Sequence, residues 1–399
     1  MRANLRHLRA FLAVVDHGSI TRTAEICHVS QPAVTQAIRK LEREPETELF
    51  QRRAQGLFVT EPGTVLARRV RRAFGLLDPT LSELAPRLRI TATTAQLVAL
   101  VAVTEAENFT LAARRLGLAQ PTVHRAITGL EREIGRALFE RTPHGMIATR
   151  AAEMLTRATQ VAFVELDQGE AELGELLGRE VGRLVIGGMP LSRSYILPRA
   201  IARFRVRRPK LPIKVLDGPY EDMLTSLRRG EIDFLVGALR NPAPIGDVVQ
   251  RPLFEDELII VCGKDHPLRR GTPPASVADI AGFPWVVAAE GTPTRQVFTR
   301  LVETQGLAPR SLIETGSMVL MRELLQVSDH LGFISRLQIE PDLDLGAVHE
   351  LAVPLPDTFR PIGLTLRDGW SPTRAQQEFL DELEAVVEAA RTGEERRAG

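Results

Sequence analysis

A gapless internal repeat constrains the fold of this 399-residue chain more than any other feature. When the sequence is shifted by 89 residues, identical residues coincide in a constant phase: Thr21 with Thr110, Gln31 with Gln120, Leu41 with Leu130, Phe50 with Phe139 and Gly56 with Gly145. Between residues 8 and 60, about twenty of the fifty-three positions are identical in the shifted sequence. We conclude that one domain was duplicated in the N-terminal part of the chain.

Each copy has the pattern of a helix, a second helix, a tight turn, a third helix and a hairpin. In the first copy, Ser30 is expected to cap the third helix. Pro32 is tolerated in its first turn, because the first amides of a helix have no helical acceptors. The apolar period buries Val34, Ile38 and Leu41 on one face of this helix. The pattern is typical of a helix-turn-helix followed by a hairpin wing.

The opposite face of the third helix carries the groups that read DNA. It consists of amides, a hydroxyl and cations, namely Gln31, Thr35, Gln36, Arg39 and Lys40. Gln can pair with adenine and Arg with guanine in the major groove, while a hydroxyl can bind phosphate. Arg52 and Arg53 follow where a wing would meet the phosphate backbone. A single polar face is usually only solvated, but here the turn spacing, the charge and the duplication agree on DNA.

The charge is distributed unevenly along the chain. Residues 1–89 carry 15 Lys and Arg against 9 Asp and Glu, so that a net charge of +1 leaves about −5 on the remainder. A basic head suits a nucleic-acid partner. Two cysteines cannot form a disulfide framework, which favours a cytoplasmic protein, and Cys262 is interpreted as an inert buried thiol. No apolar run is long enough to span a bilayer, so no membrane partner is expected.

At this point the residues resemble a known family. SITRTAEICHVSQPAVTQAIRKLE followed by LFQRRAQGLFVTEPG resembles the winged helix-turn-helix of LysR-type transcriptional regulators, and FTLAARRLGLAQPTVHRAITGLEREIGRALFERTPHGMIAT matches the same pattern. The markers are the SQPAVT-type helix start, LExE, LFxR and T-x-x-G after the wing. The predicted DNA-binding residues are Ser30, Gln31, Pro32, Thr35, Gln36, Arg39, Lys40, Arg52 and Arg53 in the first copy, and Gln120, Pro121, Thr122, His124, Arg125 and Arg141 in the second.

Each copy departs from the family pattern at different positions. The first has Pro45-Glu46 where the family places a residue and Gly, whereas the second keeps Ile134-Gly135. The second has Ala119 in place of the capping Ser, and Ala152 where the first has Gly63. Residues 90–150 carry seven Arg against five Glu. We therefore expect the first copy to bind phosphate more strongly, and the sequence leaves open whether both copies read bases.

The resemblance implies a multidomain α plus α/β fold. We expect winged helix-turn-helix domains at residues 1–62 and 90–150, with a short helix and connector at 63–89 that is broken at Pro79 and Pro86. Residues 151–178 are expected to form a linker helix that pairs with that of a partner chain in a homodimer or homotetramer. An effector-binding domain follows at 183–391, with one lobe at about 183–254 and 341–391 and the other at about 255–340.

From Arg183 the sequence alternates strands with helices, as in α/β proteins. The resemblance implies two lobes like those of a periplasmic binding protein, with a small molecule in the cleft. The predicted effector-binding residues lie at three helix starts: Ser192, Arg193 and Ser194; Thr292, Pro293 and Thr294; and Ser317 and Met318. Hydroxyls and free amides there favour an anion such as a carboxylate, and a sugar is also open. Each residue alone is equally consistent with an ordinary N-cap.

Two other classes of function compete with a regulator. An enzyme is disfavoured because the sequence has no GxSxG, HExxH or phosphate-loop motif and its Cys and His lack metal-ligand spacing. We therefore expect no catalytic residue, metal or cofactor. A ligand-binding module could instead use its helix-turn-helix units only for protein contacts, but the basic, amide-rich face of residues 30–40 argues against that. The expected partners are double-stranded promoter DNA, a small-molecule effector and RNA polymerase.

Overall fold

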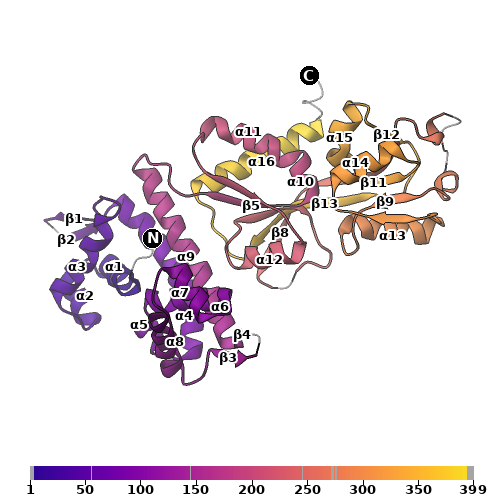
Figure 1. Ribbon diagram of the computed structural model, residues 1–399. Coiled ribbons are helices and arrows are strands. Elements are labelled where there is room, and N and C mark those ends of the chain that lie inside the picture. Colours follow the sequence, from indigo (N-terminus) through magenta and orange to yellow (C-terminus); the bar gives the residue numbers. More distant parts are fainter. Residues whose placement is uncertain are drawn as a thin grey trace. The chain divides into compact units, whose positions relative to one another are not determined.

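The computed structural model describes residues 4–54, 56–143, 145–244, 246–270, 274 and 276–392, so the first three residues of the predicted first domain lie outside it. The chain divides into two compact units. The first reaches Arg183 and also includes Arg228–Gly230, and the second comprises Leu184–Leu227 and the chain from Glu231 onward. The first unit is mainly helical and the second combines a sheet with helices (Figure 1).

The first unit contains the same succession of elements twice. The first copy consists of α1 (Leu5–His17), α2 (Ile20–Ile26), α3 (Gln31–Arg43), β1 (Phe50–Arg53) and β2 (Gly56–Val59). The second copy consists of α6 (Thr94–Ala106), α7 (Phe109–Leu116), α8 (Gln120–Ile134), β3 (Phe139–Thr142) and β4 (Gly145–Ala148). In each copy the two strands pair as an antiparallel hairpin. The order of helices and hairpin is the one that the repeat predicts.

Equivalent residues also make equivalent contacts in the two copies. The Leu49 N–H donates to the Glu42 carboxylate at 2.9 Å, and the Leu138 N–H donates to the Glu131 carboxylate at 2.9 Å. Both bonds join the third helix to the start of the hairpin. The glutamate of the LExE marker therefore fixes the path from helix to wing, which explains why this residue type recurs in both copies.

The turns of the two copies share one backbone conformation despite their different residues. The left-handed region is occupied by Gly18 (φ 62°) and Glu107 (φ 51°), by His28 (52°) and Gly117 (65°), and by Glu46 (54°) and Gly135 (75°). Each pair is separated by 89 residues. Replacing the usual Gly with Glu46 therefore leaves the turn in place, and that residue adopts a conformation which L-residues normally avoid.

The two long helices of this unit correct one prediction. α4 (Glu61–Leu84) runs for 24 residues without stopping at Pro79, and α9 (Arg150–Leu176) runs for 27. Pro79 has no N–H, so the Gly75 carbonyl loses its helical partner. Both residues are exposed, so water can bind that carbonyl. Burial of Leu77 and Leu81 holds the helix together across the proline. The helix does end before Pro86, as predicted, and α5 (Leu88–Thr91) forms the connector.

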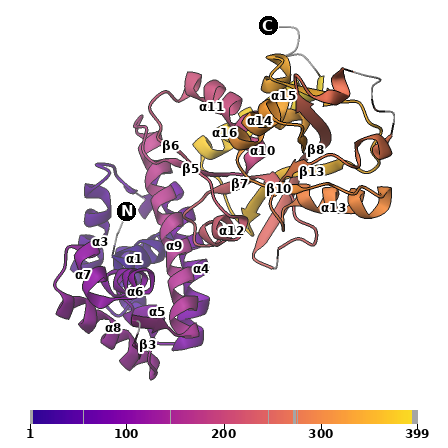
Figure 2. The same ribbon diagram turned by 45° about the vertical axis from the view of Figure 1, so that its right-hand side comes forward.

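α4 and α9 lie side by side in both views of the ribbon (Figure 1, Figure 2). A single hydrophobic core extends through both copies and both long helices, with Leu8, Leu66, Leu100 and Leu155 among its buried members. Residues 151–178 are expected to form a linker helix that pairs with a partner chain. In the structure this helix, α9, packs against α4 of its own chain.

The second unit is an α/β domain. Its strands are β5 (Leu184–Gly188), β6 (Ile213–Leu216), β7 (Phe234–Ala238), β8 (Val248–Gly263), β9 (Trp285–Val287), β10 (Leu312–Glu314), β11 (Leu331–Ser335), β12 (Val348–Leu351) and β13 (Phe359–Arg367). Its α-helices are α10 (Pro190–Ser194), α11 (Ile196–Arg207), α12 (Tyr220–Arg228), α13 (Pro293–Gln305), α14 (Met318–Val327), α15 (Arg336–Asp344) and α16 (Arg374–Thr392), and short 3₁₀ turns cover Pro267–Arg269 and Val277–Ile280.

The long strand β8 connects two lobes. Its first part pairs with β13 in the lobe ordered β13-β7-β5-β6, and its last part pairs with β11 and β12 in the other lobe. The chain returns to the first lobe only after Leu351, at β13, so the predicted return at residue 341 is wrong. The sequence does not predict β12, because Val348–Leu351 is too short to show a strand period and follows a helix that contains Pro341.

Candidate nucleic-acid interface and ligand cleft

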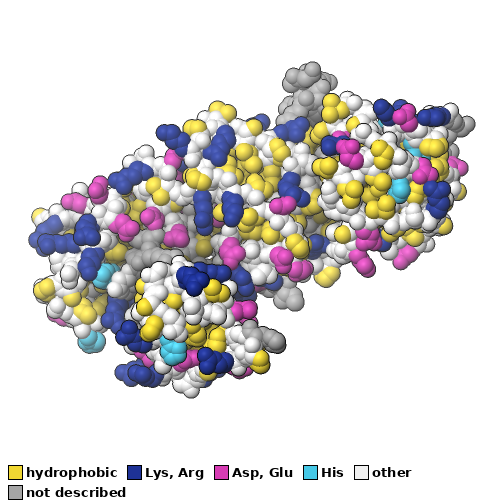
Figure 3. All heavy atoms as spheres, viewed as in Figure 1, with side chains coloured by type: hydrophobic (Ala, Val, Ile, Leu, Met, Phe, Trp, Pro, Cys, Tyr) yellow, Lys and Arg dark blue, Asp and Glu magenta, His cyan; other side chains and the backbone are white. Residues whose placement is uncertain are grey.

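The outer face of α3 presents polar side chains on a buried apolar base. Val34, Ala37, Ile38 and Leu41 are buried, as the helical period predicts. The exposed side chains are Ser30, Gln31, Pro32, Gln36, Arg39 and Lys40, and Thr35 is half-buried with its hydroxyl donating to the Gln31 carbonyl at 3.1 Å. The Ser30 hydroxyl accepts from the Ala33 N–H at 3.4 Å, so it caps α3 as expected. Lys and Arg side chains gather over α3 and the adjoining hairpin (Figure 3).

The hairpin of the first copy adds two cations to this surface. Arg52 and Arg53 are exposed on β1. The Arg53 guanidinium lies 5.4 Å from the centroid of the Phe58 ring and donates to the Gln51 side chain at 3.2 Å. A cation held over an aromatic ring keeps its charge. The wing can therefore present positive charge to phosphates while its side chains are held in place.

On the corresponding face of α8, some of the predicted side chains contact other residues of the second copy. Gln120, Pro121, Thr122, His124 and Arg125 are all exposed, as is Arg141 on β3. The Arg125 Nε donates to the Pro121 carbonyl at 3.3 Å, and the His124 ring lies 5.3 Å from Phe109. No side chain caps α8 at Ala119. The second copy thus offers the predicted residues at its surface, but two of them already contact their own copy.

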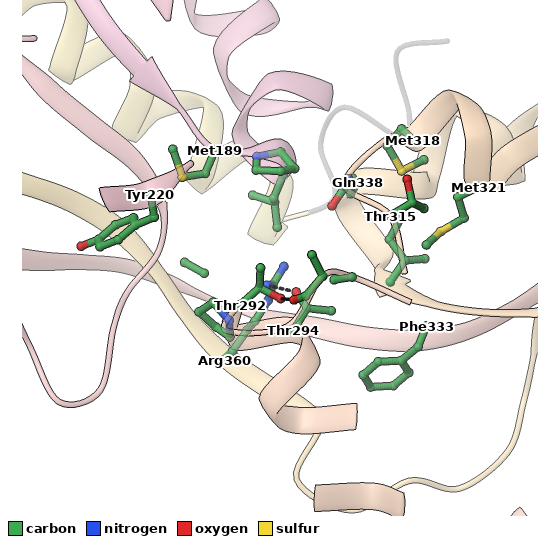
Figure 4. A pocket seen from close by; sticks show the side chains of 18 of the residues that line it. Met189, Tyr220, Thr292, Thr294, Thr315, Met318, Met321, Phe333, Gln338 and Arg360 are labelled. Carbon is green, nitrogen blue, oxygen red and sulfur yellow. Dashed lines mark hydrogen bonds between the residues drawn. The ribbon is translucent and has the colours of Figure 1, made fainter. Parts of the chain in front are cut away.

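A cleft lies between the two lobes of the second unit (Figure 4). Its first-lobe lining includes Met189, Pro190, Leu191, Tyr220, Arg240 and Arg360. Its second-lobe lining includes Thr292, Pro293, Thr294, Thr315, Ser317, Met318, Met321, Phe333 and Gln338. A concave site with a mainly apolar lining and a few polar groups is typical of small-molecule binding. The position agrees with the rule that ligands bind beyond the carboxyl ends of parallel strands.

Five of the eight predicted effector residues line this cleft, and all five lie in the second lobe. The Thr292 hydroxyl caps α13 by accepting from the Arg295 N–H at 3.2 Å. The Ser317 hydroxyl caps α14 by accepting from the Leu320 N–H at 3.3 Å. Both helix N-termini therefore open on the cleft, where their partial positive charge favours an anion.

Ser192, Arg193 and Ser194 are not in the cleft, so the structure does not bring together the full predicted set. The Ser192 side chain is buried and donates to the Met189 carbonyl at 2.8 Å, and the Ser194 hydroxyl donates to the Pro190 carbonyl at 3.4 Å. Arg193 pairs with Asp217. The hydroxyls of Ser192 and Ser194 bond back to the start of α10, and the cleft is lined there by Met189, Pro190 and Leu191 instead.

Arg240 is a cleft residue that sequence reasoning missed. Its guanidinium lies 4.1 Å from the centroid of the Tyr220 ring, and Nη1 donates to the Gly291 carbonyl of the other lobe at 2.7 Å. Among the described residues, the buried Arg240 Nε has no hydrogen-bond partner. Arg240 lies two residues after the end of β7, so the rule on strand ends could have identified it.

Arg360 lines the cleft and is paired with the buried Asp256 behind it. Arg360 Nη2 and Nε donate to Asp256 Oδ2 at 3.0 and 3.1 Å, and the Ser335 hydroxyl donates to Oδ1 at 2.7 Å. Arg360 also contacts the Thr294 hydroxyl of the second lobe. Burial raises the pKa of Asp256 and lowers the pKa of Arg360, and their mutual attraction opposes both shifts. Two charge-assisted bonds to one carboxylate oxygen favour the ionic pair, which balances the Arg360 charge internally.

Two further searches cover only the described part of the chain. None of its helices combines the length and the apolar character that a membrane crossing requires. No group of three or more His, Cys, Asp and Glu side chains in these segments is placed to hold a metal ion.

The two sites together define a transcriptional regulator with a DNA-binding part and an effector-binding domain. The family model "LysR substrate binding domain" matches residues 177–388, and "Bacterial regulatory helix-turn-helix protein, lysR family" matches residues 5–64 and 94–177. The chain belongs to the LysR family of transcriptional regulators, whose members are regulators and not enzymes.

Individual relatives agree with this assignment. The HTH-type transcriptional regulator GalR of Pseudomonas putida is 33% identical over 370 residues, covering 92% of this chain and 93% of that protein. The regulator CysL of Bacillus subtilis is 30% identical, covering 61% of this chain and 80% of CysL. The alignment with GalR covers 92% of this chain, so it must include part of the first copy. The alignment with CysL covers 61% and leaves over a third of this chain unmatched.

Solved structures show the same fold at low sequence identity. A full-length OxyR variant from Pseudomonas aeruginosa is 19% identical with a TM-score of 0.53, covering 73% of this chain and 93% of OxyR. The LysR family regulator CbnR is 17% identical with a TM-score of 0.51, covering 73% of this chain and 98% of CbnR. Both comparisons support the arrangement of a helix-turn-helix region and a two-lobed domain.

Proposed function

We propose that both copies are winged helix-turn-helix domains that bind double-stranded promoter DNA, with α3 and α8 in the major groove. The observation that carries the proposal is the repeated construction of these helices, in which equivalent apolar residues are buried and the opposite face is exposed. A structure of CbnR complexed with its target DNA has the same fold. The two domains correspond to residues 1–62 and 90–150.

The two copies have unequal roles in this proposal. Gln36 and Arg39 are exposed on α3 and are suited to adenine and guanine edges, where each two-bond pairing discriminates by about 1–3 kcal/mol. On α8, Arg125 bonds to its own helix, so it must leave the Pro121 carbonyl before it can reach a base. The first copy therefore supplies most of the affinity and the second extends the site.

Footprinting of matched double variants tests both roles. We expect Gln36→Ala/Arg39→Ala to reduce affinity at least tenfold and to erase one part of the footprint. Thr122→Ala/Arg125→Ala should remove another part with a smaller loss, and Lys210→Ala/Lys214→Ala, at exposed sites of the second unit, should change neither. An unchanged footprint for the α8 variant would make the second copy structural, and no binding in low salt by the unaltered chain would refute DNA binding.

We also propose that the effector is a small organic carboxylate with an apolar body. The N-termini of α13 and α14 and the Arg240 Nε can receive the carboxylate. Met189, Met318 and Phe333 supply apolar contact around the rest of the molecule. The polar side chains of the second-lobe lining lie mainly at the starts of α13 and α14, while the apolar side chains cover the rest, which favours a ligand with one polar end over a sugar.

Thermal denaturation with defined probes tests the effector class. Benzoate and succinate separate an apolar from a polar carboxylate, while benzamide and glucose are the neutral controls. Benzoate should raise the melting temperature, because a ligand at a hundred times its Kd stabilises the folded state by about 2.7 kcal/mol. Arg240→Ala should abolish that rise and Lys214→Ala should preserve it. Equal stabilisation by glucose would contradict the proposal.

The cleft offers a route from effector to DNA. Arg240 and Arg360 each bridge the lobes, through Gly291 and Thr294. We propose that an effector competes for or completes these bridges and so shifts lobe closure, which changes DNA geometry and contact with RNA polymerase. A footprint that is identical with and without a stabilising ligand would contradict this coupling.

A further inference from the structure

Residues that are equivalent in the two copies touch each other. The Leu5 N–H donates to the Thr94 hydroxyl at 3.3 Å, and these two positions are separated by 89 residues. A small cleft beside them is lined by three further equivalent pairs: Ala73 and Ala162, Phe74 and Phe163, and Leu77 and Leu166. Equivalent residues of two copies meet in this way at a two-fold axis, as in an interface between identical subunits. The two copies are therefore related by an internal pseudo-two-fold axis that passes near Phe74 and Phe163.

The long helices have the direction that such an axis requires. Arg68 on α4 pairs with Glu172 on α9 at 2.7 Å. Arg72, one turn further along α4, pairs with Glu165, which comes before Glu172 on α9, at 3.0 Å. Partner numbers on α9 therefore fall as numbers on α4 rise. The two helices are antiparallel, and they lie side by side in Figure 1 and Figure 2.

A buried ionic network joins α4 to α9. The Arg69 side chain is fully buried, and its Nη1 donates to Glu165 at 2.9 Å and to Gln168 at 2.9 Å. Its Nε donates to Glu172 at 3.0 Å. Glu165 is also buried, so each charge depends on the other helix for its neutralisation.

This network distinguishes α4–α9 pairing from the pairing of identical helices. The repeat places Ala158 at the position equivalent to Arg69, and Leu76 at the position equivalent to Glu165. Two α9 helices paired about the same axis would set Glu165 against Ala158, and two α4 helices would set Arg69 against Leu76. An α9–α9 pair leaves the buried Glu165 without a counter-charge, which is strongly unfavourable. An α4–α4 pair removes one of the two carboxylates that contact Arg69, because only Glu172 has an acidic equivalent, Glu83. The sequence therefore selects the unlike pair.

We infer that the α4–α9 pair within one chain replaces the pairing of identical linker helices from two chains, so that a single chain presents α3 and α8 to one operator. The operator then consists of two unlike half-sites in opposite orientation. This inference rests on the proposal that both copies bind DNA. It replaces the expectation that residues 151–178 pair with a partner chain, and it leaves the effector-binding domains free to join chains.

Counting chains per DNA duplex tests the inference on the unaltered protein. The probe is a set of duplexes selected by the full chain from random 40-base-pair sequences. With DNA in excess, native mass spectrometry should find one chain per duplex, or two chains carrying two duplexes where effector domains associate. Two chains on one duplex at DNA excess, or one chain protecting a single half-site, overturns the inference and leaves DNA binding intact. Failure to select any duplex refutes the proposed function and the inference with it.

Engineered cysteines at the pseudo-axis separate the three possible pairings. In a Cys27→Ser background, Ala73→Cys/Ala162→Cys should form a disulfide within one chain when oxidised with copper–phenanthroline, and gel electrophoresis under non-reducing conditions should show a compact monomer. Cross-linked dimers of this double variant would instead show α4–α9 exchange between chains. Ala162→Cys alone should give no dimer, because a dimer would show α9 paired with α9. Either kind of dimer, or no cross-link in the double variant, overturns the inference.

Discussion

At the scale of single residues, equivalent positions of the two copies can be compared directly, because they share a backbone conformation but differ in residue type. Three equivalent pairs of positions adopt the left-handed conformation, and one member of each pair is glycine. The other members, His28, Glu46 and Glu107, carry a Cβ in a conformation that costs an L-residue about 1–2 kcal/mol. Duplication has left each copy with strain that the other copy avoids.

Exchanging residues between equivalent positions should relieve or create this strain. We expect Glu107→Gly to raise the free energy of unfolding by about 0.5–1 kcal/mol, because relief of strain exceeds the added flexibility of the unfolded chain. Gly18→Glu, at the equivalent position of the first copy, should lower it by about 1–2 kcal/mol. Urea denaturation measures both. Changes of the same sign in the two variants would show that the backbone relaxes at these turns.

The two cysteines should differ sharply in reactivity. Cys27 is exposed, whereas Cys262 is buried on β8, and burial raises the pKa of its thiol to about 11. Since the thiolate is the reactive form and the pKa is raised, Cys262 stays protonated at pH 8. We expect Ellman's reagent to titrate one thiol per native chain and two after unfolding. Cys27→Ser should leave no fast thiol, and a rapid reaction of Cys262 in that variant would contradict its burial.

The residues of the cleft were only partly predictable. Helix starts after strands identified Thr292 and Ser317, since capping residues have a sequence signature. The same logic failed at Ser192, because the N-cap of α10 is Met189 and the Ser192 hydroxyl is buried within the helix. Arg360 could not be found in this way: its role depends on Asp256, which is 104 residues away and meets it only through the pairing of β8 with β13.

At the scale of elements, local pattern succeeded where local forces decide the structure. The helices and hairpins of both copies follow from apolar period, caps and turns. Proline misled at Pro79, because burial of Leu77 and Leu81 outweighs one lost hydrogen bond on the exposed side of α4. Strand β12 is stabilised by its pairing with β8, which comes from a distant part of the chain. The four residues of β12 alone do not predict that pairing.

Two glycines of α4 should respond oppositely to alanine. A Cβ at Gly63 would overlap the Leu49 carbonyl, which lies in backbone and cannot move aside easily. We expect Gly63→Ala to destabilise the first copy by about 1–3 kcal/mol. Gly75 has open space around a Cβ, so Gly75→Ala should stabilise the helix by up to about 1 kcal/mol. Urea denaturation distinguishes them, and equal effects would show that α4 shifts to accommodate the methyl group.

At the scale of the whole molecule, the sequence predicts a duplication but does not predict how the long helices of the two copies pack together. The apolar stripes of α4 and α9 are consistent with pairing to any similar helix. The choice of partner depends on Arg69, Glu165 and Glu172, whose mutual contacts appear only when the helices are aligned antiparallel. In the proposed arrangement, the two copies have within one chain the two-fold relation that separate chains usually provide.

The salt dependence of DNA binding also belongs to the scale of the whole molecule. The net charge is only +1, but residues 1–89 carry a surplus of six cations that can contact phosphates. Each phosphate contact contributes about 0.9 to the slope of log K against log salt. Arg52→Ala/Arg53→Ala should therefore reduce the slope by about 1.8, and Arg141→Ala by about 0.9.

The matched control removes two exposed cations from the effector-binding domain. Lys210→Ala/Lys214→Ala changes the net charge of the chain as much as the first-copy wing variant does. Fluorescence anisotropy between about 50 and 200 mM salt gives the slopes. If wing cations bind phosphate locally, the control retains the original slope. If the control slope falls as far as that of the wing variant, affinity follows total charge, and neither wing contacts the backbone in the proposed way.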